Sequence, residues 1–213
     1  MKSVRVFYKK TGRMKFVSHL DMNRYFLRLV KLAKLPVWYT EGFNPHPYIT
    51  FALPLSLGFE SEYEVVDMRV DDECSFEQIR MGLSENAVEG IEIFKVDSPK
   101  MKSGKISKAE YRLEFDGKFD TEKFTEFLKS DSIITQKKTK KGVMKQVNLG
   151  GMIFEFDLKE KDPPVVEICL AAGENNLNPR LLTRTYTEMT GVCLPEYSVT
   201  RTKLLVASGD VFA

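Results

Sequence analysis

The sequence predicts an α+β fold of two tandem ferredoxin-like (split β-α-β) domains, with antiparallel sheets and helices on one face of each. Strand-like and helix-like patterns follow the order β-α-β-β-α-β over the first part of the chain. A similar order recurs after a stretch of four lysines with Pro, Gly and Ser that shows no periodicity. We therefore expect a first domain at 1–97, a basic linker at 98–108 and a second domain at 109–213. A single continuous α+β sheet is the alternative.

Local patterns justify the elements of the first domain. Residues 4–8 are rich in β-forming side chains and predict the first strand. Ser18 and Asp21 resemble a capping box that begins a helix, and Ser75 and Gln78 form a second capping box at the start of a short helix. That helix ends before Pro36, because proline disfavours helical geometry at the residue preceding it. The expected remaining elements are two strands, a short helix and a fourth strand, at 48–57, 62–70, 75–83 and 91–96.

The second domain repeats this order with an inserted hairpin. Asp120 and Asn178 are typical helix N-caps, and Gly191 is placed to end the second helix. A lysine-rich turn at 137–142 separates two strand-like pieces within 133–147. The other strands are expected at 111–115, 152–158, 165–170 and 197–206.

The composition excludes several classes of protein. The 213 residues are 43% hydrophobic with a net charge of +2, so no global field indicates a nucleic-acid or membrane partner. Cys74, Cys169 and Cys193 include no CxxC pair, which argues against a disulfide framework or an iron–sulfur site made by this chain. Without a signal-peptide core or a stretch of about 20 apolar residues, we expect a cytoplasmic protein with no membrane partner.

The segment 12–61 contains both histidines and the only tryptophan. His19, in the first helical turn, and His46, between two prolines, are candidates for an acid–base pair, with Glu41 as a candidate carboxylate. The alternative is that His19 bridges the helix start to the sheet and His46 shapes a turn. Because two histidines without a third ligand give weak support for a metal, we predict no metal and no cofactor.

A basic helix face and a group of aromatic residues predict RNA binding. Arg24, Arg28 and Lys31 recur on the face opposite the apolar one, and aromatic residues follow in the next loop. Phosphate contacts combined with base stacking are what a single-stranded RNA binder needs. A solvated helix face is the alternative. The predicted binding residues are Asp21, Arg24, Arg28, Tyr39, Phe43, Asn44, Tyr48, Arg180, Arg184 and Arg201.

The chain has no sequence motif of an established catalytic site. GxGxxG, GxxxxGK[ST] and HExxH do not occur, and Ser18 is better explained as a helix N-cap than as a nucleophile. These absences favour a binding protein over an enzyme.

Three motifs carry a family resemblance. They are FVSHLD at 16–21, YTEGFNPHP at 39–47 and ALPLSLG at 52–58. Together they are similar to the bacterial radical-SAM-linked protein family. This is a domain of unknown function found alone or fused to the C-terminus of a cobalamin-binding-type radical SAM protein. Residues 177–191 and 199–204 fit the family's C-terminal pattern, whereas 147–151 depart from it where an Asp and an Arg-Pro pair are expected.

The resemblance implies work beside a radical SAM protein in RNA- or translation-related modification. The family's genes often lie near radical SAM, ribonuclease E/G-type and ribosomal-protein genes. The leading hypothesis is an accessory protein that presents an RNA or protein substrate to a separate radical SAM enzyme through the surface of residues 18–47. One alternative is an RNA-processing or RNA-modifying enzyme that uses His19 or His46. Another is a small-molecule-binding domain with Trp38, Phe43 and Tyr48 around an apolar pocket.

Overall fold

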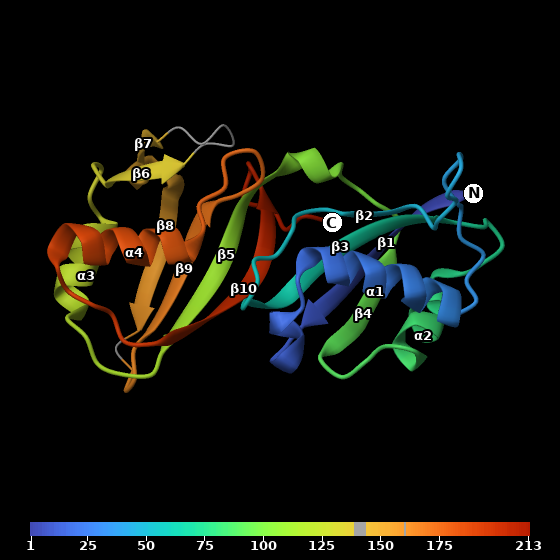
Figure 1. Cartoon of the computed structure of the whole chain (residues 1–213), viewed down its shortest axis with the longest axis horizontal. Coiled ribbons are helices and arrows are strands. Elements are labelled where there is room, and N and C mark those ends of the chain that lie inside the picture. The colour runs from blue at the N-terminus through green and yellow to red at the C-terminus, as the bar shows by residue number, and fades with distance from the viewer. Residues whose placement is uncertain (139–143, 160) are drawn as a thin grey trace. The chain divides into compact units, whose positions relative to one another are not determined.

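The computed structural model describes residues 1–138, 144–159 and 161–213, and it is a mixed α+β structure (Figure 1). The chain divides into two compact units: unit 1 is Met1–Ile106 with Arg201–Ala213, and unit 2 is Ser107–Thr200. The expected second domain at 109–213 therefore includes a C-terminal segment that packs within unit 1. Most of the expected lysine-rich turn, residues 139–142, lies outside the described residues.

Unit 1 has an antiparallel sheet covered by two α-helices. Its elements are β1 (Lys2–Lys10), the 3-10 turn η1 (Gly12–Phe16), α1 (His19–Leu32), β2 (Ile49–Phe51), β3 (Glu60–Val70), α2 (Phe76–Glu85), β4 (Ile91–Asp97) and the 3-10 turn η2 (Ser103–Lys105). The strand order is β4-β1-β3, and β2 pairs with β3. Val6 lies opposite Val66 on one side and Val96 on the other.

The core of unit 1 follows from the alternation of β1 and the helical periodicity of α1. Val4, Val6 and Tyr8 point to one face of the sheet and pack in one buried cluster with Phe26 of α1 and Ile79 of α2. This places both helices on the same face, as Figure 1 shows. The predicted N-caps are confirmed, since Ser18 accepts a hydrogen bond from the Asp21 amide and Ser75 forms a full capping box.

The strand predicted at 48–57 is much shorter in the structure. It ends at Phe51, and the carbonyl oxygens of Leu53 and Pro54 accept hydrogen bonds from the Arg201 guanidinium rather than from a neighbouring strand. Leu55 is buried although it lies outside the strand.

Unit 2 has antiparallel strands, two α-helices and a separate two-stranded hairpin. Its elements are β5 (Ile106–Phe115), α3 (Thr121–Leu128), β6 (Ile134–Lys138), β7 (Met144–Asn148), the 3-10 turn η3 (Gly150–Met152), β8 (Ile153–Lys159), β9 (Val165–Ala171), α4 (Pro179–Thr190) and the first part of β10 (Tyr197–Val206). The residues of β10 from Arg201 onward belong to unit 1. The strand order is β10-β5-β9-β8, and β6 pairs only with β7 among the described residues. The predicted caps at Asp120, Asn178 and Gly191 are confirmed.

Candidate functional site

The loop predicted to carry function is a hairpin between α1 and β2, and its base lies beside the end of β3. Three backbone hydrogen bonds hold its base: Trp38 N–H to Arg69 O, Tyr48 N–H to Trp38 O, and Thr40 N–H to His46 O, each 2.9 Å. The tip turns at Gly42, whose φ of 118° is a conformation that favours glycine. Residues 41–45 are all exposed. We call residues 38–48 the aromatic hairpin.

An aromatic and cationic cluster forms at the base of this hairpin. The Trp38 and Tyr48 rings meet edge to face with their centroids 5.4 Å apart. The Arg69 guanidinium lies 5.4 Å from the Trp38 ring centroid and 5.9 Å from that of Tyr48. These are cation–π distances. Arg69 was not predicted as a site residue, because only its pairing with the hairpin in the folded chain brings it to these rings.

Other aromatic residues of the hairpin are open to solvent. Tyr39 is 43% exposed and Tyr48 is 41% exposed, whereas Phe43 at the tip is fully exposed. The Phe43 ring is therefore not enclosed with Trp38 and Tyr48 in this structure. The exposed rings offer faces on which flat ligands can stack.

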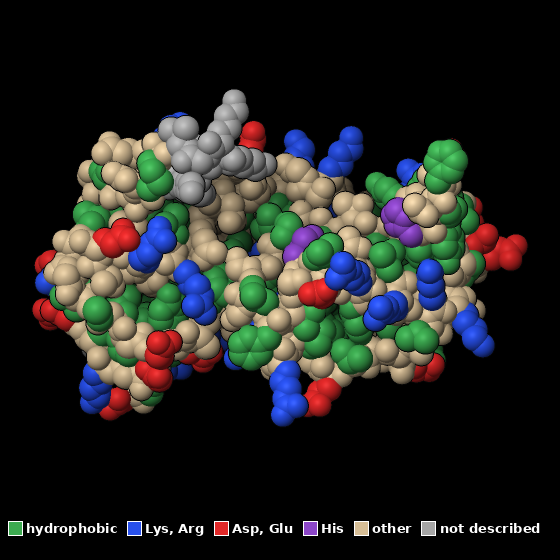
Figure 2. Space-filling view, viewed as in Figure 1, with side chains coloured by type: hydrophobic (Ala, Val, Ile, Leu, Met, Phe, Trp, Pro, Cys, Tyr) green, Lys and Arg blue, Asp and Glu red, His purple; other side chains and the backbone are tan. Residues whose placement is uncertain are grey.

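The outer face of α1 carries a row of cations. Arg24, Arg28 and Lys31 are exposed, and Figure 2 shows Lys and Arg side chains along this helix. Asp21 lies at the start of the row, with 3.0 Å between its carboxylate and the Arg24 guanidinium. The Ser18 hydroxyl, and then Arg24, lower the pKa of Asp21. Asp21 therefore belongs to the cap at the start of the helix. The side chains that follow it on this face, Arg24, Arg28 and Lys31, are all cations.

The two histidines do not meet. Figure 2 shows them as two separate purple patches on the same face of the molecule. The His46 ring nitrogen Nδ1 lies 3.0 Å from the Asn44 carbonyl oxygen and 3.2 Å from the Thr40 hydroxyl, so His46 and Asn44 shape the hairpin turn. Because the rings are apart, they cannot exchange a proton directly as an acid–base pair.

His19 has a partly buried environment of its own. Its ring packs edge to face on Phe51 with 5.0 Å between centroids. Burial lowers the pKa of His19, while the Glu64 carboxylate acts in the opposite direction. The neutral imidazole is therefore favoured in the folded chain. The third catalytic candidate, Glu41, is exposed in the hairpin tip.

A buried ion pair anchors the motif region. Arg201 is 1% exposed, and its Nε and Nη2 atoms donate to the Glu64 carboxylate at 2.9 and 2.6 Å. Its remaining N–H groups donate to the Leu53 and Pro54 carbonyl oxygens at 3.0 and 3.4 Å. The sequence placed Arg201 among the surface binding residues. The structure places it inside unit 1, so its contribution is to fix residues 53–54.

A second buried cation holds the other motif. The Lys10 ammonium donates to the Val17 carbonyl oxygen at 2.8 Å, directly before the helix cap at Ser18. Burial lowers the pKa of Lys10, and the nearby Glu64 carboxylate partly offsets that effect. The backbones of the FVSHLD and ALPLSLG motifs are thus each bound by a buried cation. The Glu64 carboxylate pairs with one of these cations, Arg201, and interacts electrostatically with the other, Lys10.

The remaining predicted cations lie in unit 2. Arg180 and Arg184 are exposed one turn apart on α4 and line a cleft of about 310 Å³ with Tyr197. The Arg180 guanidinium lies 6.0 Å from the Tyr197 ring centroid, and Arg184 pairs with Glu188 at 3.3 Å.

Two absences concern only the described part of the chain. No group of three or more His, Cys, Asp or Glu side chains there is arranged to hold a metal ion. No helix there is long and apolar enough to cross a membrane.

Comparison with known proteins places the chain in a family. It belongs to a family of uncharacterized proteins conserved in bacteria (DUF2344), which it matches over residues 3–179. No curated protein matches the sequence. Among solved structures, it is similar to a chain of a Cbf5-Nop10-Gar1 complex, with a TM-score of 0.49 and 8% sequence identity. That match covers 93% of this chain, which spans about half (48%) of the other one.

The buried pair gives a stability prediction. Arg201→Met leaves the Glu64 carboxylate buried without its partner, so we expect the free energy of unfolding to fall by about 3–5 kcal/mol in urea titrations. The double variant Glu64→Met/Arg201→Met removes both charges, so its free energy of unfolding should fall less than that of Arg201→Met alone. Arg28→Met, at an exposed position, is the matched control and should change stability by less than about 0.5 kcal/mol. Equal losses for the two arginine variants would contradict the anchoring role.

The environment of His19 gives a pH prediction. Since the folded-state pKa is lowered, its contribution to stability is complete above the unfolded-state pKa of about 6.5 and is lost as the pH falls through the folded pKa. The free energy of unfolding should therefore fall more between about pH 7 and pH 5 in the wild type than in His19→Gln. His46→Gln is the control: it retains His19, so its free energy of unfolding should fall between these two pH values by as much as that of the wild type. An unchanged pH dependence in His19→Gln would refute this.

Proposed function

We propose that this chain is a non-catalytic accessory protein that binds single-stranded RNA on unit 1 and presents it to a separate radical SAM enzyme. The observation that carries the RNA part is the succession of the α1 cation row and the aromatic hairpin. The row formed by Arg24, Arg28 and Lys31 reaches the last turn of α1, and the hairpin begins shortly afterwards at Trp38. Both features belong to the same unit.

The chemistry of the two features suits the two parts of a nucleotide. Exposed guanidinium and ammonium groups neutralise phosphates and release condensed counterions. Exposed aromatic faces stack on bases of any identity, each stacked base contributing about 1–3 kcal/mol. The Arg69 guanidinium beside Trp38 and Tyr48 adds a cation next to the stacking surface. This combination favours sequence-tolerant binding of single strands.

The radical SAM part of the proposal comes from the motif resemblance. The motifs at 16–21, 39–47 and 52–58 are similar to those of radical-SAM-linked proteins. A binding role is supported over acid–base catalysis because His19 and His46 lie apart, and His46 bonds within its own turn.

We also propose that each unit is ferredoxin-like. Unit 1 has the element order β-α-β-β-α-β with strand order β4-β1-β3 and β2 beside β3. Unit 2 repeats the arrangement as β10-β5-β9-β8, with β6 and β7 as an insertion. These orders support the split β-α-β topology.

RNA binding is tested with a fluorescent oligouridylate of about twelve nucleotides, a length such surfaces cover. For Arg24→Gln/Arg28→Gln/Lys31→Gln, we expect weaker binding in anisotropy titrations. The slope of log Kd against log salt should fall by about 2, because three phosphate contacts on a single strand are lost. Tyr48→Leu should weaken binding by about 1 kcal/mol without changing that slope, because it removes stacking and no charge.

A charge-matched control distinguishes a binding surface from net charge. Lys102→Gln/Lys105→Gln/Lys123→Gln removes the same charge from exposed positions outside the α1 row and the hairpin. It should leave affinity and slope near the wild-type values. If the two triple variants behave alike, or the wild type binds no oligouridylate at low salt, the RNA-binding proposal fails.

The partnership is tested by anaerobic affinity purification of the tagged chain from its native bacterium, followed by mass spectrometry. We expect a protein with a three-cysteine radical SAM motif to be enriched over a tag-only control. Ribonuclease treatment separates a direct contact, which survives it, from one bridged by RNA, which is lost. Absence of any radical SAM protein in both treated and untreated samples would contradict the partnership and leave the RNA proposal standing.

A further inference from the structure

Strand β8 is an edge of the unit 2 sheet. It pairs antiparallel with β9, with Phe156 opposite Ile168 and Leu158 opposite Val166. Among the described residues, no other strand pairs with β8, and no backbone hydrogen bond joins Phe154–Leu158 to a segment outside this ladder. Alternate N–H and C=O groups of an edge strand point outward and can bond a further strand.

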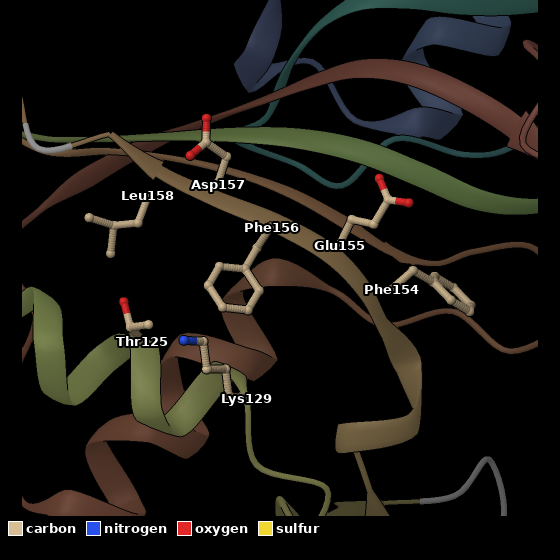
Figure 3. Close-up of a pocket in the computed structure, with 7 residues that line it drawn as sticks. All are labelled: Thr125, Lys129, Phe154, Glu155, Phe156, Asp157 and Leu158. Atoms are coloured by element: carbon tan, nitrogen blue, oxygen red, sulfur yellow. The ribbon is translucent and has the colours of Figure 1, made fainter.

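A groove of about 630 Å³ runs between this edge and α3. Thr125 and Lys129 line it from α3, and Phe154–Leu158 line it from β8. Figure 3 shows the Phe156 ring directed toward α3, whereas Glu155 and Asp157 project to the opposite side of the strand. An added strand would therefore meet apolar side chains on one face and carboxylates on the other.

Strand β8 carries two exposed carboxylates. Glu155 and Asp157 are exposed, and neither has an ion-pair partner among the described residues. The adjacent carboxylate on β9 differs, because Glu167 pairs with Lys159 at 2.8 Å and lies 3.9 Å from Arg112. These cations lower the pKa of Glu167, the Lys159 bond being the largest cause. Among the described residues of β8 and β9, the exposed carboxylates without an ion pair are thus Glu155 and Asp157 of the edge strand.

We propose that β8 binds an extended segment of a protein partner by strand addition, and that this segment alternates apolar residues with Lys or Arg. The apolar residues would face the groove beside Phe156 and Leu158. The basic residues would lie opposite Glu155 and Asp157, where opposite charges stabilise a cross-strand pair. Main-chain hydrogen bonds supply affinity in this mode of recognition, and the side-chain pattern supplies specificity.

The same charges disfavour two other occupants. A second copy paired antiparallel about Phe156 would set Glu155 opposite Asp157 of its partner, and like charges directly opposite are destabilising. Shifting that pairing to the neighbouring registers sets Glu155 or Asp157 against itself. RNA is disfavoured because the exposed carboxylates repel phosphates. The inference goes beyond the proposed RNA binding and does not depend on it.

The test uses a labelled peptide of alternating valine and lysine, capped at both ends and seven residues long to match β8. Three controls are a peptide of the same composition in two blocks, one alternating valine and glutamate, and one N-methylated at alternate residues, which cannot complete the ladder. We expect anisotropy titrations to show binding of the alternating lysine peptide alone. Amide hydrogen exchange should become slower in residues 153–159.

Variants of the full chain assign the binding to β8. Glu155→Lys/Asp157→Lys should weaken peptide binding by about tenfold or more while retaining oligouridylate binding. Glu85→Lys/Glu174→Lys makes the same charge change at exposed positions elsewhere and should bind the peptide normally. The midpoint of urea unfolding shows whether each variant is folded. Slower amide hydrogen exchange at residues 153–159 of the wild type tests the location of the peptide without any substitution.

Four outcomes would overturn the proposal. They are no binding of the alternating lysine peptide, equal binding of the block or N-methylated peptide, protection elsewhere than at β8, or equal weakening by the two double variants. Concentration-dependent dimerisation that protects β8 and excludes the peptide would assign the edge to a second copy instead.

Discussion

The buried pair of Arg201 and Glu64 is the constraint on which the arrangement of unit 1 depends. A guanidinium removed from water must have its N–H groups bonded, and here a carboxylate and two backbone carbonyls accept from it. Satisfying Arg201 therefore fixes β3, residues 53–54 and the C-terminal half of β10 in one geometry. This is a physical reason for Arg201–Ala213 to belong with unit 1 although the chain passes through unit 2 first.

Sequence patterns predicted the features that arise within one turn or one strand. The N-caps at Ser18, Ser75, Asp120 and Asn178 are local, because each cap bonds an amide two or three residues ahead. The apolar face of α1 was equally predictable from its spacing. The mixed α+β class followed from the order of such local elements.

What the sequence could not predict depends on partners far apart in the chain. Glu64 and Arg201 are 137 positions apart, and nothing local distinguishes Arg201 from an exposed arginine such as Arg184. The early end of β2 has the same origin, since carbonyls that would continue a strand bond to Arg201 instead. Arg69 meets its aromatic partners, Trp38 and Tyr48, only in the folded chain, so no local pattern marks it.

The two anchored motifs also explain how a projecting loop can form a defined surface. Binding a ligand to a mobile loop loses affinity to the ordering of that loop, and a pre-organised loop avoids much of this loss. Here Lys10 and Arg201 hold the backbone at Val17 and at 53–54, on the two sides of α1 and the hairpin. Backbone bonds and the Trp38–Tyr48 contact then fix the base of the hairpin. The contacts at the base thus define where the exposed tip with Phe43 begins, and they place the partly exposed Tyr48 ring beside Trp38, where it is suited to stacking.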